Sequence, residues 1–461
     1  MESPEQSAPV AAEVEEDVLD ESVEHVQPPA PAAPRTRFRR KRDYAVVVLI
    51  VLVVAGVATF WWRNSDAAAT TSVTNADTSL TVPPKPAKVP AEFKQLWQAR
   101  SGSTTDPVIV GPTVVTGDKH VVTGHDPVTG ASRWSYDRGN VDLCTVTAAW
   151  GKAVAVYHKT HNCSEVTELD GVTGKRGAQR NGDAELGTQL MGDSTYLSTS
   201  GTKIIDTWRS DLVQTQQYGT VTAQVNHDKQ PRLNCVYSSE MAGPNLLGVI
   251  ERCPDEQYNR FTLLRPGGTE GDGEKPNVLF SVQVPGDGGR IVALTEQRSA
   301  IALPNPSRLV IWNSTGSQVE TVPLAGVDLA AVPNSVVQPT VALTCIQTPD
   351  QNGTCEPNSW STTNSVGVRL ITWFTGSKTI ALSGTTLDPL WTVDGSFGPG
   401  TVYADRVLVP VPGGLAVVDP ANGNRGPDVK VDRKGYQGQV RLATLGDVLV
   451  EQRGDTLVAM R

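Results

Sequence analysis

A strand–turn–strand repeat in the second part of the chain constrains the fold more than any other feature. Each copy has a short β-branched strand, a turn built on Asp or Asn with Gly, and a second strand. The clear copies begin at His120, Glu165, Arg308, Thr379 and Gly414, and looser copies begin at Lys203 and Arg260. Their spacing broadly matches the roughly 40–50 residues of a four-stranded propeller blade. The repeat therefore predicts an all-β propeller.

The two ends of the repeat region look like complementary halves of one further copy. The stretch Thr456–Arg461 reads as a first strand without its partner, and Phe93–Arg100 can supply that partner. Pairing them closes the ring and removes the free sheet edges that invite aggregation. We count eight blades including the shared one, and seven if one looser copy is an elaboration. Two separate β-sandwiches, the alternative, would not need complementary ends.

Three tryptophans occupy the same slot beside the turn, at Trp97, Trp134 and Trp391. A large aromatic side chain repeated at one slot fits packing between neighbouring blades, because each blade must bury its faces against the next. We therefore predict that these three side chains belong to the core. Stacking on a cofactor is the alternative role.

The composition argues against two other classes of protein. With 42 Gly, 32 Pro and 19% charged residues, long helices would be interrupted too often for a helical bundle or a coiled coil. The formal net charge of −9 argues against a nucleic-acid-binding protein, which normally carries a basic face. We therefore predict no nucleic-acid partner.

The stretch from Tyr44 to Trp62 carries no charge and is close to the about 20 residues that a helix needs to cross a bilayer. Bases crowd its N-terminal side, so the positive-inside rule predicts a cytoplasmic N-terminus. We expect Trp61 and Trp62 at the outer interface. The bases that we expect at the lipid headgroups are Arg39, Arg40, Lys41 and Arg42. A signal peptide cleaved near Ala67–Ala69 is the alternative.

The span divides the chain into four predicted segments. Residues 1–43 form a disordered cytoplasmic tail, acidic up to residue 34 and basic beside the membrane. Residues 44–62 form the transmembrane helix. Residues 63–92 are rich in Ala, Thr, Ser and Pro and form a flexible tether with a reach of about 30 Å. Residues 93–461 form the extracytoplasmic propeller.

All six cysteines follow the span, which indicates disulfides in an exported domain. Neighbouring strands make the simplest pairing Cys144 with Cys163, Cys235 with Cys253, and Cys345 with Cys355. The alternative is a metal site on His158, His161 and Cys163. No second cluster completes its four ligands, so we predict no metal.

The repeat resembles the PQQ-like β-propeller superfamily, whose blades carry an Asp-x-x-Thr-Gly turn. The matching stretches are Asp126–Gly130, Asp170–Gly174 and Asp419–Gly423. This motif specifies a fold and no activity. Quinone-dependent dehydrogenases of the superfamily use calcium and a disulfide between adjacent cysteines, and no two cysteines are adjacent here. That enzyme is a minor alternative, and we predict a protein without catalytic residues or cofactor.

The layout of tail, span, tether and disulfide-containing propeller is similar to the actinobacterial membrane-anchored propellers, the family that includes the mycobacterial polar growth factor. The resemblance implies a periplasmic lipid-binding or accessory factor in the export of mycolate glycolipid and in polar growth. Its implied partners are membrane lipid, a trehalose-linked mycolate glycolipid, an RND-type lipid exporter and other envelope proteins. The implied location is the bacterial inner (plasma) membrane. A protein–protein interaction scaffold without a lipid ligand is the alternative function.

A glycolipid binder needs an apolar groove with a few polar groups. Outside the repeated slots, the candidate contact residues are Trp360, in a polar run, and Trp373 and Phe374, in the stretch LITWFTG. The alternative for Trp373 and Phe374 is that they belong to a buried strand.

Overall fold

The computed structural model describes residues 40–222, 228–270, 272, 275–329, 337, 340–346 and 368–461, and the side chains of 342–346 and 368 lie outside this description. The Arg39, Cys355 and Trp360 predictions also lie outside the described residues, as does the side chain of Cys345. The chain divides into two units, Met1–Trp61 and Trp62–Arg461, and each is considered by itself.

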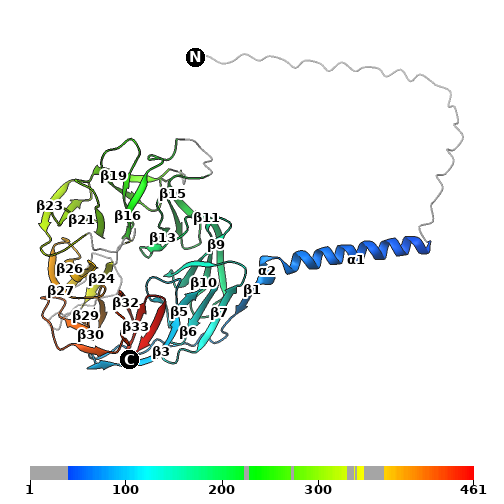
Figure 1. Cartoon of the computed structure of the whole chain (residues 1–461), viewed down its shortest axis with the longest axis horizontal. Helices are drawn as coiled ribbons and strands as arrows, with labels where there is room; N and C mark the ends of the chain where they lie inside the picture. The colour runs from blue at the N-terminus through cyan, green and yellow to red at the C-terminus, as the bar shows by residue number, and fades with distance from the viewer. Residues whose placement is uncertain are drawn as a thin grey trace, which may run out of the picture. The chain divides into compact units, whose positions relative to one another are not determined.

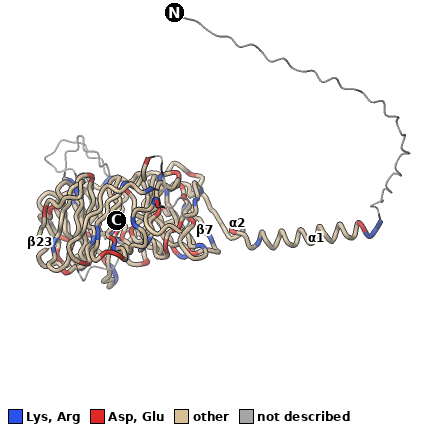
Figure 2. The backbone as a smooth tube through the Cα atoms, turned by 90° about the horizontal axis from the view of Figure 1, so that it is seen from above, with Lys and Arg blue, Asp and Glu red and all other residues tan. Residues whose placement is uncertain are grey.

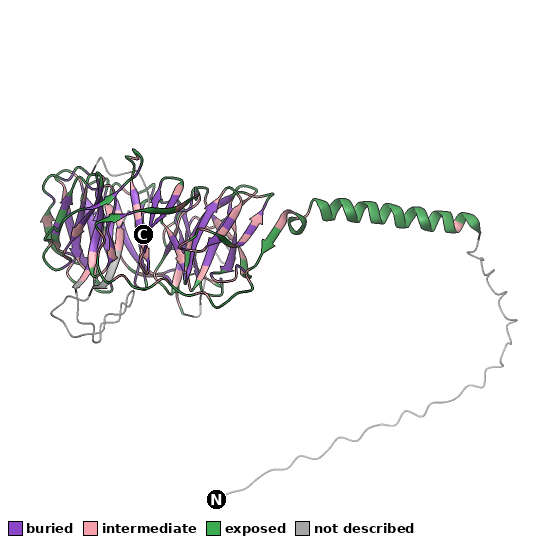
Figure 3. Cartoon of the chain, turned by 90° about the horizontal axis from the view of Figure 1, so that it is seen from below, coloured by how far each residue is buried: buried purple, intermediate pink, exposed green. Residues whose placement is uncertain are grey.

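The first unit contains most of helix α1 (Lys41–Arg63), which includes the predicted span. Within the described residues it is the one helix long and apolar enough to cross a membrane, by length and composition. Its residues are exposed along its length (Figure 3), and its charges gather at its ends (Figure 2). Trp61 and Trp62 are 72% and 64% exposed at its C-terminal end. Arg40 precedes the helix, and Lys41 and Arg42 begin it.

The second unit is a ring of four-stranded antiparallel sheets, the blades. Blade 1 contains β4 (Val108–Val110), β5 (Thr113–Asp118), β6 (Val121–His125) and β7 (Ser132–Arg138). Blade 2 contains β8 (Leu143–Ala149), β9 (Lys152–Lys159), β10 (Asn162–Asp170) and β11 (Arg176–Ala184). Blade 3 contains β12 (Leu190–Gly192), β13 (Tyr196–Thr199), β14 (Ile204–Arg209) and β15 (Gln214–Gly219). Blade 4 contains β16 (Val236–Gly243), β17 (Leu246–Arg252), β18 (Arg260–Arg265) and β19 (Asn277–Gln283).

The remaining blades follow the same order. Blade 5 contains β20 (Arg290–Leu294), β21 (Arg298–Leu303), β22 (Arg308–Asn313) and β23 (Gln318–Pro323). Blade 6 contains β24 (Thr340–Ile346), β25 (Val368–Phe374), β26 (Lys378–Ser383) and β27 (Pro389–Asp394). Blade 7 contains β28 (Thr401–Tyr403), β29 (Arg406–Val411), β30 (Gly414–Val418) and β31 (Val429–Val431). Blade 8 contains β32 (Val440–Leu445), β33 (Val448–Arg453), β34 (Thr456–Met460) and β3 (Gln95–Arg100).

Blade 8 joins the two ends of the ring, as the sequence predicts. Strand β3 pairs antiparallel with β34, so that Gln95 lies opposite Met460 and Arg100 lies opposite Thr456. The ring is therefore a closed propeller of eight blades, and the count of seven is excluded (Figure 1).

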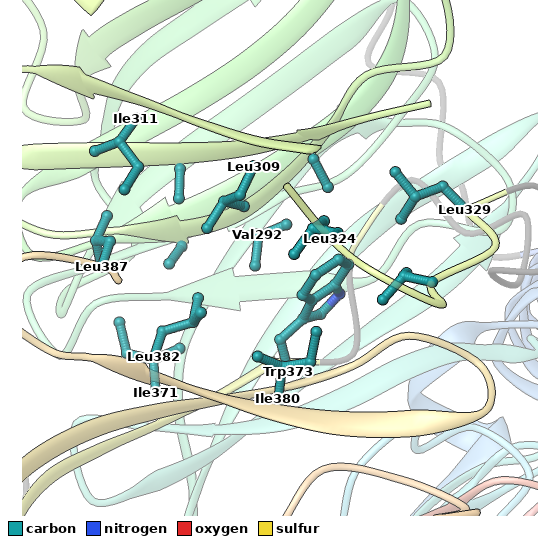
Figure 4. Packing of buried hydrophobic residues seen from close by; sticks show 14 residues of the cluster. Val292, Leu309, Ile311, Leu324, Leu329, Ile371, Trp373, Ile380, Leu382 and Leu387 are labelled. Carbon is teal, nitrogen blue, oxygen red and sulfur yellow. The ribbon is translucent and has the colours of Figure 1, made fainter. Parts of the chain in front are cut away.

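The hydrophobic core lies between the blades. One cluster takes Val292 and Leu309 from blade 5 and Ile371 and Trp373 from blade 6, all buried (Figure 4). Strand residues facing the two sides of a sheet alternate, so each blade presents apolar side chains to both neighbours. Nearly continuous apolar strands such as β29 follow from this two-sided burial.

Part of the segment expected to be a flexible tether is folded on the ring. A short helix, α2 (Asp66–Ala69), leads into β1 (Thr70–Val73), which adds a fifth strand to blade 1 by pairing antiparallel with β7. Strand β2 (Glu92–Phe93) pairs parallel with β31 of blade 7. Outer strands have unpaired backbone groups, and the β-branched residues of β1 suit a place beside them.

The chain between β1 and β2 also contacts the ring. The backbone N–H of Asn75 donates to the carbonyl of Thr173 in blade 2 at 2.9 Å. Further along, Lys85 forms an ion pair with Asp405 of blade 7 at 3.3 Å. The expectation of a free tether over residues 63–92 is therefore corrected, because strand pairing and these contacts fix much of this segment to the propeller.

Two of the three predicted disulfides lie among the described residues, and both are present. Cys144 on β8 is bonded to Cys163 on β10, so the bond spans β9 within blade 2. Cys235 is bonded to Cys253, and the bond joins the two ends of the β16–β17 hairpin. The bond expected between Cys345 and Cys355 stays a prediction.

Candidate binding site at the mouth of the ring

The turns that join the first strand to the second in blades 1–4 come together at one end of the ring, which we call the cavity face. A cavity of about 660 Å³ opens there, bounded by blades 1–6. We call it the central cavity. It is lined by residues 109–111, 148–151, 190–194, 241–244, 293–294, 337, 340 and 371.

The wall of the central cavity combines apolar side chains with a similar amount of polar surface. Its larger side chains include Ile109, Leu190, Met191, Leu294 and Ile371, which come from four different blades. Convergence of apolar side chains with a few polar groups is the usual composition of a small-molecule or partner site.

Trp150 is the aromatic residue of the central cavity, and the sequence analysis did not single it out. It lies in the β8–β9 turn with a φ of 52°, followed by Gly151 with a φ of 72°. This turn holds the half-buried side chain at the rim. The indole N–H donates to the carbonyl of Thr195 in blade 3 at 3.1 Å.

Asp193 is an acidic residue of the lining, and backbone groups already occupy its carboxylate. One oxygen accepts from the N–H groups of Thr195 at 2.9 Å and Tyr196 at 2.6 Å. The other oxygen accepts from the N–H of Asn245 in blade 4 at 2.6 Å. This residue therefore ties blade 3 to blade 4 at the rim, and its lone pairs are largely used.

Glu240 lies directly behind the wall, next to the lining residue Met241 on β16, and is fully buried. Its carboxylate accepts from the N–H of Gly201 at 3.1 Å and 3.4 Å. Burial raises the pKa of Glu240 well above its ordinary value, the Gly201 N–H opposes the shift, and Glu185 adds to it. The sequence gives no signal for this residue, because SSEMAGPN reads as a polar loop.

The three slot tryptophans lie between blades, as predicted. Trp134 of blade 1 is fully buried, and its indole N–H donates to the carbonyl of Gly171 in the turn of blade 2 at 3.1 Å. Trp97 donates in the same way to Pro127 of blade 1 at 2.9 Å, and Trp391 to Pro420 of blade 7 at 3.2 Å. Each accepting residue directly follows the turn aspartate of the next blade, so these side chains hold adjacent blades together.

The structure places Trp373 and Phe374 in the buried strand β25, where they are 0% and 4% exposed. Trp373 packs among Leu324, Ile380 and Val292 (Figure 4). Neither side chain lines the central cavity. Of the two interpretations that the sequence left open, this position fits the buried strand.

The alternative metal site on His158, His161 and Cys163 is not formed, because Cys163 is held in a disulfide. Within the described part of the chain, no group of three or more His, Cys, Asp or Glu side chains is arranged to hold a metal ion.

Comparison with known proteins finds similarity of fold at low sequence identity. No family model matches the chain, and no curated protein sequence matches it. Among solved structures, BamB from Moraxella catarrhalis is 13% identical over 80% of this chain and 99% of its own, with a TM-score of 0.46. The C-terminal WD40 domain of Sif2 is 11% identical over 81% of this chain and 99% of its own, with a TM-score of 0.48.

An enzyme is also among the similar structures. The quinohemoprotein alcohol dehydrogenase ADHIIG from Pseudomonas putida HK5 is 12% identical over 80% of this chain and 76% of its own, with a TM-score of 0.44. Likeness at this level concerns the propeller fold alone, since propellers carry many unrelated functions.

Proposed function

We propose that this protein is a non-enzymatic, membrane-anchored propeller that binds a component of the cell envelope through the central cavity. The observation that carries the proposal is the wall of that cavity, which brings apolar side chains from several blades to one opening. Its rim polar groups bond to one another, as Trp150 does with Thr195 and Asp193 with Asn245. The cavity therefore offers apolar surface to a ligand.

The proposed location is the inner membrane of a bacterium, with the N-terminus in the cytoplasm and the propeller outside. The apolar helix α1 supports an anchor, and the bases at its N-terminal end support this orientation. The disulfides support an oxidising compartment. Reporter fusions test the orientation: alkaline phosphatase joined after Arg461 is expected to be active, and an active cytoplasmic reporter there would contradict it.

The resemblance to the actinobacterial propellers supports a finer form of the proposal. In this form the apolar group is an acyl chain of a trehalose-linked mycolate glycolipid, and an RND-type exporter is the partner. The volume of about 660 Å³ lies within the range of roughly 300–1,000 Å³ typical of ligand pockets.

Native mass spectrometry of the full chain, released from its own membranes in mild detergent, tests for this lipid. We expect a bound glycolipid in the natural protein and its loss in Ala148→Trp, because residue 148 is exposed and lines the cavity. The matched control is Val319→Trp, an exposed substitution on the outer strand β23. Recovery of the natural protein without lipid, with unchanged envelope lipids after depletion, would contradict the finer form.

An interaction scaffold without a lipid ligand is the second candidate. Trp150 at the rim favours it, because tryptophan is enriched among the residues that dominate protein interfaces. A photo-crosslinking amino acid at position 150 is then expected to capture one envelope protein reproducibly, with no change after lipid extraction. A crosslink to lipid alone would favour the first candidate.

A further inference from the structure

Residues 66–91 lead from the end of α1 onto the ring, and we call them the strap. At its start, α2 leads into β1, which pairs with β7 of blade 1. At its end, the carbonyl of Ala91 accepts from the N–H of Lys430 in blade 7 at 3.1 Å. Among the described residues, no backbone hydrogen bond joins residues 76–90 to the ring. The backbone of the strap is therefore fastened to the propeller at its two ends.

The middle of the strap has the burial pattern of a polyproline II helix that lies on a surface. The half-buried residues are Leu80, Pro83, Pro86 and Val89, and the residues between them are exposed. A spacing of three matches the three residues per turn of this helix, which has no internal hydrogen bonds. A Cβ placed on Gly446, in the β32–β33 turn of blade 8, would collide with the carbonyl of Pro83. One edge of the helix therefore packs on the ring, and the other two edges face solvent.

The prolines of the strap make its docking less costly in entropy. Proline fixes the backbone angle φ, so the free chain has fewer conformations to lose when it docks. A polyproline II helix advances about 3.1 Å per residue, so residues 80–89 span roughly 30 Å. A segment with the composition of a linker is thus already extended before it contacts the ring. Weak contacts are sufficient to hold such a segment in place.

The end of the strap nearest to α1 is held by contacts with which water and salt compete. The side chains of β1 are exposed or half-buried, and Val73 is 54% exposed. Asp66 pairs with Lys159 at 3.1 Å, and the two side chains are 48% and 43% exposed. Exposed ion pairs contribute little to stability and are weakened by salt. Because β1 buries little apolar surface, we expect this end of the strap to open at a small cost in free energy.

We propose that the strap is a releasable leash that sets how far the propeller reaches from its membrane anchor. This inference rests on the anchor described under the proposed function. With the strap docked, Asn64 and Ser65 alone join α1 to α2, which is about 7 Å of extended chain. Release of α2 and β1 frees residues 64–74, and full release frees residues 64–91, with a root-mean-square reach of about 30 Å. The propeller then meets its ligand or partner at more than one distance from the bilayer.

The full chain in lipid nanodiscs tests the leash, and retention of the chain in the discs tests the anchor separately. A donor dye is attached through an unnatural amino acid in place of Val319, an exposed residue of β23, and an acceptor dye is attached to a lipid headgroup. Single-molecule energy transfer is expected to show a docked population with efficient transfer and a released population with inefficient transfer. Because salt screens the ion pairs of the strap, we expect the released population to grow about two- to five-fold between about 50 mM and about 500 mM NaCl. A single population at both salt concentrations would overturn the proposal.

A locked variant tests whether the released population comes from the strap. Val73 lies opposite Ser135 in the pairing of β1 with β7, so cysteines at both positions are placed to form a disulfide. The oxidised variant with Val73→Cys and Ser135→Cys is expected to lose the released population, because β1 stays on blade 1. Val73→Cys alone is the matched control and is expected to keep both populations. A released population that persists in the locked variant would overturn the proposal.

A second variant weakens the docking of the middle of the strap. Gly446→Ala places a Cβ against the carbonyl of Pro83 and is expected to increase the released population several-fold. Its matched control is Gly395→Ala, because Gly395 also has a positive φ, of 66°, and nothing lies within 4 Å of a Cβ placed there. Equal released populations in the two variants would show that the strap does not depend on its contact with blade 8, and would contradict release of the strap as proposed.

Discussion

The turn glycines that face the slot tryptophans allow neighbouring blades to pack closely, because a side chain at these positions would collide with the indole ring. Gly174 has a φ of 70°, and a Cβ placed there would lie 2.6 Å from Trp134. We expect Gly174→Ala to lower the free energy of unfolding by about 2–4 kcal/mol, because it combines a left-handed backbone with overpacking. Denaturant titration followed by tryptophan fluorescence measures the loss.

The matched control for this prediction is Gly413→Ala. Gly413 has a φ of 76°, and nothing lies within 4 Å of a Cβ placed there. Gly413→Ala therefore measures only the cost of placing alanine in a left-handed backbone conformation, which is roughly 1–2 kcal/mol. Equal losses in the two variants would mean that the tryptophan contact contributes nothing beyond backbone strain.

The buried residue Glu240 is expected to make the stability of the protein depend on pH. Its folded pKa is raised above the ordinary value of 4.5, so the folded protein keeps a proton that the unfolded chain releases. Stability from this group therefore falls as pH rises above about 4.5 and continues to fall until the folded pKa is reached. We expect Glu240→Gln to be more stable than the natural protein at neutral pH, with the difference shrinking near pH 4.

Thermal unfolding midpoints across pH 4–9 measure this difference. The control is Glu92→Gln, which changes an exposed residue and is expected to follow the natural protein at every pH. A Glu240→Gln variant that is less stable at neutral pH would show that the buried carboxylate is compensated by a partner.

Among whole elements, β1 and α2 differ most from the sequence prediction. Residues 63–92 have the composition of a linker, and a four-residue strand is too short to reveal a period. What holds β1 is a free sheet edge on blade 1 and the ion pairs of Asp66, both distant in sequence. The core slots were predictable because Trp97, Trp134 and Trp391 repeat beside a common turn, whereas Trp150 occurs once.

The attachment of β1 depends in part on Asp66. The hydrogen bond from Lys159 is the main reason that the pKa of Asp66 is lowered. The stability that Asp66 contributes is therefore fully present above pH 3.8, and it is lost as the pH falls through the lowered pKa of the folded protein. We expect Asp66→Asn to speed amide hydrogen exchange in Thr70–Val73 about two- to five-fold, since an exposed ion pair contributes about 0.2–1 kcal/mol.

Exchange is measured on the full chain by mass spectrometry. Asp211→Asn, which breaks an exposed pair with Arg209 far from β1 in sequence, is expected to leave the exchange of β1 unchanged. Unchanged exchange in both variants would show that strand pairing with β7 holds β1 without the help of Asp66.

At the scale of the whole molecule, the ring depends on its last strand. Strand β34 lies between β33 and β3, and its residues Leu457, Val458, Ala459 and Met460 are almost fully buried. Three of these are large apolar side chains, and burying each stabilises the fold by roughly 1.5–3 kcal/mol. Their sum approaches the about 5–15 kcal/mol by which a typical domain is stable.

We therefore expect deletion of residues 456–461 to abolish cooperative unfolding, because β3 would lose its partner and blades 8 and 1 would separate. Deletion of Arg461 alone is the matched control. Arg461 exchanges backbone hydrogen bonds with Lys94 at 2.9 Å and 3.0 Å and pairs with Asp447, so its loss should cost only about 1–3 kcal/mol. Circular dichroism melting of both variants distinguishes the outcomes. A cooperative melt after the longer deletion would mean that seven blades close without the eighth.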